Sequence, residues 1–140
     1  MSWLHAHFDR KTALHAILNL DAARDDIMLT LAHGYVLEDG VLIGLAGGGG
    51  TVRRGPDRFA RRVALAFTDA RGTWHELEAA SLTSFPWQCW PNMVAFNCLA
   101  RWHYRGREGY GEIQDFYELP QITGLNAGRA APAGEWAECD

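Results

Sequence analysis

Glycine-containing reversals set between aromatic runs constrain this chain more than any other feature. Residues 105–112 hold three glycines and lie between the aromatic runs 102–104 and 115–117. Glycine admits the positive φ angles of a tight turn, and aromatic residues fit a pleated surface, so the pattern predicts a long β-hairpin. The dipeptide Asp39-Gly40 is the strongest short hairpin signal and predicts a second reversal.

Similar turn signals divide most of the chain into short β-runs. Closing an antiparallel sheet on itself removes its unpaired edges. We therefore predict an all-β fold: an antiparallel lipocalin-like β-barrel or a strongly curled sheet of about eight strands. Ala and Arg in residues 58–67 also suit a helix, but the Arg71-Gly72 turn that follows favours a strand. The expected hairpins are 2–20, 27–48, 58–84 and 93–119, with links at 21–26, 48–57 and 85–92.

The length and composition indicate one soluble domain. A chain of 140 residues with 48% hydrophobic residues can bury a core without disulfides or metals. We assign residues 1–120 to the barrel and expect 121–140, rich in Ala, Gly and Pro, to form a flexible C-terminal tail. The formal charge of −4 argues against nucleic-acid binding. No apolar run is long enough for a membrane span, and three cysteines without a C-x-x-C pair predict a cytoplasmic location.

Hairpin parity predicts which side chains point inward. A two- or four-residue loop in the last hairpin pairs even positions of its first strand with odd positions of its second, and the apolar face then carries one acid, Asp115. Glu112 falls on the outer face, where we expect an ion pair with Arg101. A three-residue loop at 70–72 places His75 on an apolar face with Phe67. The first hairpin sets His5 opposite His15, with His7 diagonal to both.

Asp115 is the sharpest candidate for chemistry. A carboxyl group surrounded by Trp102, Phe96 and Tyr117 would be desolvated and would hold a proton more readily, which suits a general acid. The alternative is that Asp115 accepts hydrogen bonds from Tyr117 or a backbone amide, or stays ionised at the rim.

Other motifs have both functional and structural interpretations. The histidines of the first hairpin could bind a metal, but they lack the carboxylate and glycine spacing of a cupin, so we expect no metal. Residues 47–50, four glycines, are followed by no Gly-Lys-Ser/Thr, so a bulge leading into a mobile loop is expected. Five arginines at 53–62 form either an anion site or, more simply, a solvated face. Residues 85–91 either cap a barrel mouth or plug the barrel as core, and Cys98 is expected to be a buried structural thiol.

Four segments resemble one family. The opening Trp3-Leu4-His5, residues 34–40, residues 65–72 and residues 105–112 are together similar to the C-terminal barrel of the lipocalin-like carotenoid hydratase (hydroxyneurosporene synthase) family and its uncharacterised bacterial relatives. The resemblance implies an enclosed apolar ligand and acid-initiated addition of water to an isoprenoid double bond, or assistance to a cyclisation. Family members commonly carry two such domains, which implies a homodimer or a second lipocalin-like domain in trans. The family's Tyr/Asp/His/Trp cluster has its nearest equivalents by type in Tyr117, Asp115, His5 and Trp102.

The resulting hypothesis is a barrel that binds a hydrophobic small molecule, such as a terpenoid, steroid or polyketide, and catalyses acid-assisted hydration, isomerisation or cyclisation without a cofactor. The alternative is a non-catalytic carrier or assembly domain with the same pocket. The expected catalytic residues are Asp115, His75 and His5, and the expected ligand-binding residues are Trp102, Tyr104, Tyr117, Phe96, Trp90 and Tyr35.

Overall fold

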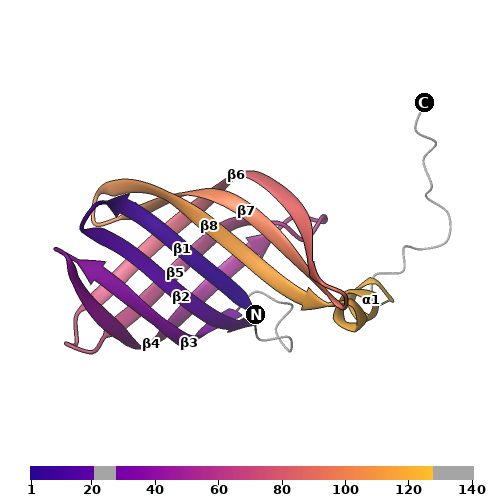
Figure 1. Cartoon of the computed structure of the whole chain (residues 1–140), viewed down its shortest axis with the longest axis horizontal. Helices are drawn as coiled ribbons and strands as arrows, with labels where there is room; N and C mark the ends of the chain where they lie inside the picture. Colours follow the sequence, from indigo (N-terminus) through magenta and orange to yellow (C-terminus); the bar gives the residue numbers. More distant parts are fainter. Residues whose placement is uncertain (21–27, 128–140) are drawn as a thin grey trace.

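The protein is an all-β, closed antiparallel barrel, as the sequence predicts. A computed structural model describes residues 1–20 and 28–127, and residues 124–127 by backbone only. Eight strands follow one another around the barrel in chain order, and β8 pairs with β1 to close it (Figure 1). This succession of neighbouring antiparallel strands is the up-and-down topology of lipocalin-like barrels.

The strands agree with the expected hairpins and are longer than expected at two places. The register shift between Leu45 and Gly47 confirms a bulge just before the four glycines at 47–50, but these glycines lie within β4 and not in a loop. Most of the expected link 85–92 belongs to β6. The first part of the expected tail is the helix α1, while the link 21–26 and residues 128–140 lie outside the described residues. The elements are β1 Ser2–Asp9, β2 Thr12–Leu20, β3 Met28–Glu38, β4 Val41–Arg54, β5 Ala60–Asp69, β6 Trp74–Trp90, β7 Met93–Tyr104, β8 Arg107–Glu118 and α1 Leu119–Ala127.

Two-residue turns fix the register of two hairpins. Asp39 and Gly40 have φ angles of 52° and 81°, and Arg105 and Gly106 have 48° and 73°. Two successive positive φ angles are the signature of the type I′ turn, whose twist matches that of paired strands. The turn at Arg105 sets Arg101 opposite Tyr110 rather than opposite Glu112.

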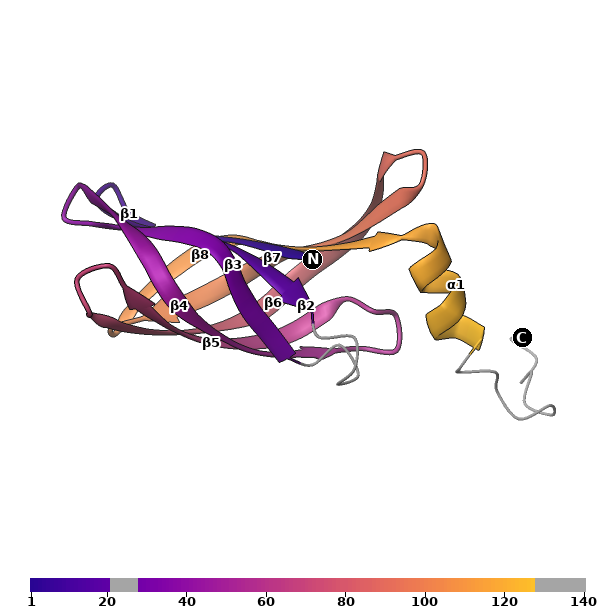
Figure 2. The ribbon, with the colours of Figure 1, turned by 90° about the horizontal axis from the view of Figure 1, so that it is seen from below.

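The β1–β2, β3–β4, β5–β6 and β7–β8 turns lie at one end of the barrel, which we call the turn end (Figure 1). The opposite end carries the first residue of β1, the β4–β5 and β6–β7 connections and the last residue of β8. The β6–β7 hairpin extends beyond the barrel at this opposite end (Figures 1 and 2).

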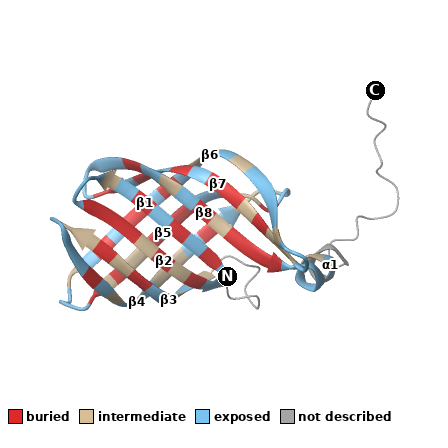
Figure 3. Cartoon of the chain, in the orientation of Figure 1, coloured by how far each residue is buried: buried red, intermediate tan, exposed pale blue. Residues whose placement is uncertain are grey.

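Side chains that alternate along the strands fill the barrel. Buried and exposed residues alternate along most strands (Figure 3), as a period of two requires. Trp102 and Phe67 are fully buried, and both lie on the faces that parity predicts to be inward. An eight-stranded barrel is just wide enough for its own side chains to fill it. The core includes Leu4, Leu14, Ala16, Leu18, Val52, Val63, Leu65, Leu77, Ala79, Cys98, Ala100 and Ile113.

Close approach between strands explains the glycine at position 111. A Cβ atom there would lie 1.7 Å from the carbonyl oxygen of His5 on the neighbouring strand β1. No side chain fits at that distance, so the last glycine of the 105–112 motif serves the β1–β8 seam rather than the turn.

Candidate functional site

Asp115 points into the barrel, as predicted, but it is not isolated there. Its carboxylate is fully buried and accepts a hydrogen bond from Arg54 Nε at 2.7 Å. The hydroxyl of Ser2 donates to the other carboxylate oxygen. Three strands, β1, β4 and β8, therefore meet at one buried carboxylate. A buried carboxylate held by a guanidinium and a hydroxyl is the arrangement of a structural ion pair, not of the unpartnered acid that we expected.

Only part of the expected aromatic cluster surrounds Asp115. Phe96 lies directly opposite Asp115 on β7, and its ring packs against Tyr117 with a centroid distance of 5.7 Å. Trp102 lies six residues further along β7, about 20 Å away at the usual rise of a strand. Trp90 is 53% exposed and packs against Phe116 on the outside of the sheet. Trp102 and Trp90 therefore do not join Phe96 and Tyr117 around the acid.

His75 lies at the turn end, in a chain of buried polar groups. It is fully buried; its Nε2 lies 3.1 Å from Asp69 Oδ2, and its Nδ1 lies 2.7 Å from the hydroxyl of Tyr104. A carboxylate can only accept, so Nε2 carries a hydrogen directed at Asp69 and Nδ1 faces the phenol. Tyr104 is 3% exposed, and its hydroxyl also lies 3.3 Å from Glu38 Oε1.

The β5–β6 turn holds Asp69 in place. Its Oδ1 accepts hydrogen bonds from the backbone N–H groups of Arg71 and Thr73, both at 2.8 Å. This is the local side-chain-to-backbone pattern by which Asp favours turns. The second carboxylate oxygen is thereby directed at His75, two strand positions past the turn.

The surroundings fix the charge states of Asp69 and Tyr104, the two groups that hydrogen-bond to His75. Burial alone would raise the pKa of Asp69, but hydrogen bonds from Thr73, His75 and Arg71 outweigh burial and lower that pKa below its ordinary value. Burial raises the pKa of Tyr104 to about 12, with a further contribution from the Glu38 carboxylate and an opposing one from Arg105. Asp69 is therefore anionic and Tyr104 is a neutral phenol at pH 7.

Tyr104 borders a polar cavity at the turn end. The cavity has a volume of about 180 Å³ and is lined by Thr12, Glu38, Asp39, Tyr104, Arg105 and Arg107. Arg105 pairs with Glu38, and the Arg107 guanidinium donates to Asp9 and to Thr12. The ring of Phe8 packs against Tyr104 with a centroid distance of 5.3 Å on its apolar side. We call this space the turn-end pocket.

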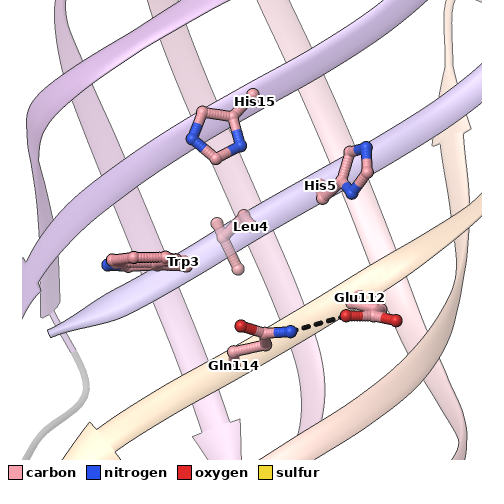
Figure 4. A pocket seen from close by; sticks show the side chains of 6 residues that line it. All are labelled: Trp3, Leu4, His5, His15, Glu112 and Gln114. Carbon is pink, nitrogen blue, oxygen red and sulfur yellow. Dashed lines mark hydrogen bonds between the residues drawn. The ribbon is translucent and has the colours of Figure 1, made fainter.

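His5 and Tyr35 lie outside the barrel. The predicted pairing of His5 with His15 is confirmed, but His5 points outward and lines a shallow depression of about 170 Å³ with Trp3, Leu4, His15, Glu112 and Gln114 (Figure 4). Tyr35 packs against His15 with a centroid distance of 5.3 Å. Since inward and outward positions alternate on β1, His5 cannot share the barrel interior with Asp115.

The histidines of this depression show no metal-site arrangement. Partial burial, and then the neighbouring His7, lower the pKa of His5 below 6.5, although Glu112 acts in the opposite direction. Partial burial also lowers the pKa of His15, with His5 and His33 adding to the effect. Within residues 1–20 and 28–127, no group of three or more His, Cys, Asp or Glu side chains could hold a metal ion.

The basic cluster disperses in the fold. Arg54 turns inward to Asp115, whereas Arg61 forms an exposed ion pair with Asp57. Arg53 and Arg62 lie directly opposite each other on the outer face. The expected pair of Arg101 with Glu112 is wrong: both lie on the outer face, but Arg101 Nε lies 3.6 Å from Glu108, because the two-residue turn shifts the register from the one that a four-residue loop would give.

Sequence reasoning missed Arg54 and Asp69 as partners of the two inward ionisable groups. The sequence predicts a loop at Arg54, and nothing local connects this residue to Asp115, 61 residues away. Asp69 had a signal that could have revealed it, because an Asp just before an Arg-Gly turn commonly caps that turn. Comparisons with known proteins gave no match among protein-family models, curated proteins or solved structures. None of the described helices is both long and apolar enough to cross a membrane.

Proposed function

We propose that this barrel is a cofactor-independent proton-transfer enzyme that uses Tyr104 as the group that meets the substrate. The observation that carries the proposal is the continuous buried chain Asp69–His75–Tyr104, which ends at the turn-end pocket. Buried acid–base groups in line, with one end at a cavity, are the arrangement that general acid catalysis requires.

The geometry supports two arrangements of the hydrogens. Tyr104 has one phenolic hydrogen, which it can direct either to His75 Nδ1 at 2.7 Å or to Glu38 at 3.3 Å. When the phenol donates to Glu38, Nδ1 must carry its own hydrogen, and the resulting imidazolium is balanced by Asp69. In this second arrangement, His75 Nδ1 holds a proton that can replace the one that Tyr104 donates.

A substrate oxygen in the turn-end pocket would take the place of Glu38 as acceptor. Tyr104 donates its hydrogen to that oxygen, and His75 Nδ1–H passes to the phenol oxygen. His75 is left neutral, with Nε2–H still directed at Asp69, while the displaced Glu38 carboxylate in the same pocket accepts the α-hydrogen and the substrate becomes an enol. The acid formed at Glu38 exchanges its hydrogen with solvent. The reverse transfers then return a solvent hydrogen to the α-carbon, the hydroxyl hydrogen of the enol to Tyr104, and a proton to His75. A phenol with a pKa near 12 acts in this scheme as a hydrogen-bond donor and acid, and not as a base.

The lining of the pocket favours a substrate with a polar end. Charged and hydroxyl side chains surround it, and its volume of about 180 Å³ fits a small molecule or one polar group of a larger one. We therefore infer a carbonyl compound that undergoes enolisation, isomerisation or hydration. The wholly apolar ligand and the cytoplasmic location remain predictions from the sequence.

Deuterium incorporation tests the proposal. We would incubate the protein in D₂O with a panel of small ketones, enones and keto acids and follow exchange of α-hydrogens by proton NMR. Wild-type protein should accelerate exchange for at least one compound, and Tyr104→Phe should lose that acceleration. Tyr110→Phe is the matched control, because it removes an exposed phenol that donates a hydrogen bond to Glu108. Equal exchange by Tyr104→Phe and wild type would refute the role of Tyr104.

A second candidate, a non-catalytic carrier, is favoured by Trp102. Its indole Nε1–H is buried and has no hydrogen-bond partner among the described residues, whereas buried Trp N–H groups usually find an acceptor. In a carrier, the core side chains around Trp102 would move apart to admit a small ligand, and a carbonyl or hydroxyl oxygen of that ligand would supply the acceptor. The carrier predicts a ligand mass retained in native mass spectrometry and lost in Trp102→Phe, with no exchange activity; release of no ligand from wild type would count against it.

A further inference from the structure

The β6–β7 hairpin carries a long stretch without charge. From Ala79 to Ala100 the sequence contains no Asp, Glu, Lys, Arg or His, although 21% of the chain is Asp, Glu, Lys or Arg. The stretch covers the second half of β6 and the first part of β7, the part that extends beyond the barrel (Figure 2). Soluble proteins rarely leave such a surface without a function.

Large apolar side chains are exposed along this hairpin. Phe85, Trp87 and Trp90 are 56%, 54% and 53% exposed, and Leu82 is 48% exposed. Phe85 and Trp87 lie opposite Asn97 and Ala95, which are on the outer face of β7. The aromatic rings therefore project from the outside of the sheet. They neither plug the barrel nor belong to its core. We call this surface, with Leu82, the aromatic end.

The same part of β6 is an open sheet edge. The pairing of β5 with β6 stops at Arg62 and Ala80, whereas β6 continues to Trp90. Beyond Ala80, no strand in the described residues pairs with the side of β6 that faces away from β7. Open edges are normally protected by charged residues or made very short. On this edge no charged residue is present, and the protective features are Pro86 and the register shifts between Ser81 and Thr83 and between Gln88 and Trp90.

We propose that the aromatic end binds a second copy of this chain, with the two β6 edges antiparallel across a two-fold axis. Each chain has a formal charge of −4, so two copies repel each other at long range, and a surface without charge adds no close like-charge contact to that repulsion. An edge strand is also self-complementary in the antiparallel sense, as a two-fold interface requires. Exposed Trp and Phe with charges absent from the centre are the composition of interface cores.

A lipid surface is the rival occupant, because Trp also favours membrane interfaces. The net negative charge disfavours approach to anionic lipid, and an unpaired strand edge gains backbone hydrogen bonds from a protein strand and none from lipid tails. The second copy therefore explains both the edge and the aromatic residues. This inference does not rest on the proposed proton transfer.

The oligomeric state of the full chain tests the proposal. Light scattering during size exclusion, repeated over a range of concentrations, should give a dimer for wild type and a monomer for Trp87→Glu. Trp74→Glu is the matched control: Trp74 lies on the same strand, is 56% exposed, and is at the turn end. It should remain a dimer, and circular dichroism should show that both variants fold. A monomeric wild type, a dimeric Trp87→Glu or a monomeric Trp74→Glu would each overturn the proposal. Flotation of a monomeric wild type with phosphatidylcholine or phosphatidylserine vesicles would assign the aromatic end to lipid instead.

Discussion

Replacing Arg54 by Met tests whether Asp115 is a structural carboxylate. The substitution keeps much of the aliphatic length of Arg54 but removes the guanidinium that donates to Asp115 at 2.7 Å. Asp115 is left fully buried, with the hydroxyl of Ser2 still donating a hydrogen bond to it. Removing one member of a buried pair commonly costs about 3–5 kcal/mol. Because the Arg54 side chain is 11% exposed and water can reach the site, we expect about 3 kcal/mol.

A double-mutant cycle separates the pair from its surroundings. Asp115→Leu alone leaves the Arg54 guanidinium without its carboxylate and should also destabilise the fold. The double variant Arg54→Met/Asp115→Leu should regain most of the loss, since apolar residues often replace a buried pair at little cost. We expect a coupling energy of about 2 kcal/mol or more, measured by urea unfolding followed by tryptophan fluorescence.

The exposed pair of Arg61 and Asp57 provides the control. Its side chains are 50% and 47% exposed, so Arg61→Met should change the free energy of unfolding by less than about 0.5 kcal/mol. If Arg54→Met had an equally small effect, or if the cycle were additive, Asp115 would not be held by the ion pair. An Asp115→Asn variant with full stability but no catalytic activity would restore the free-acid hypothesis.

Three further predictions concern the strands and the pH dependence. Gly111→Ala should destabilise the barrel by about 2 kcal/mol or more in urea unfolding, because its Cβ would overlap the His5 carbonyl. The control is Gly44→Ala, where nothing lies within 4 Å of the added Cβ, and it should be neutral or stabilising by a few tenths of a kcal/mol. Equal losses of stability in both variants would contradict the steric argument. Arg62→Glu should stabilise the fold by roughly 0.2–1 kcal/mol, because it replaces the like-charged pair with Arg53 by an attractive one, and a lower melting temperature would refute this. Tyr104 should remain a phenol until the pH approaches about 12, so the stability that it contributes is complete below pH 10 and is lost as the pH rises through about 12. Ultraviolet titration should show one late-titrating phenol fewer in Tyr104→Phe than in wild type, and equal titration curves near pH 12 would refute this.

The sequence predicted the strands, the turns and the inward faces because each depends on local chemistry. Asp39-Gly40 and the glycines of residues 105–112 specify reversals without reference to the rest of the chain. Once a turn length is known, the period of two decides which face each residue occupies. His75 and Asp115 were both placed inward in this way, and both are fully buried.

Partners across the barrel could not be predicted in the same way. Arg54 meets Asp115 only because β8 pairs with β1 and the sheet closes, which brings β4 across from the seam. The outward position of His5, by contrast, follows from local alternation, because Leu4, Ala6 and Phe8 form the apolar face of β1 and His5 lies on the other face. The extension of β6 past its β5 partner depends on the unequal lengths of neighbouring strands, which turn signals do not determine.

The two proposals lie at opposite ends of one strand, so each can fail without affecting the other. His75 and Trp87 are twelve residues apart on β6, which corresponds to roughly 35–40 Å along a strand. Substitutions so far apart, with no shared partner, are expected to act independently. Trp87→Glu should therefore leave α-hydrogen exchange unchanged, and Tyr104→Phe should leave the dimer intact. If Trp87→Glu abolished both the dimer and the exchange without unfolding the protein, catalysis would depend on association. The catalytic pocket would then have to include residues of the second copy.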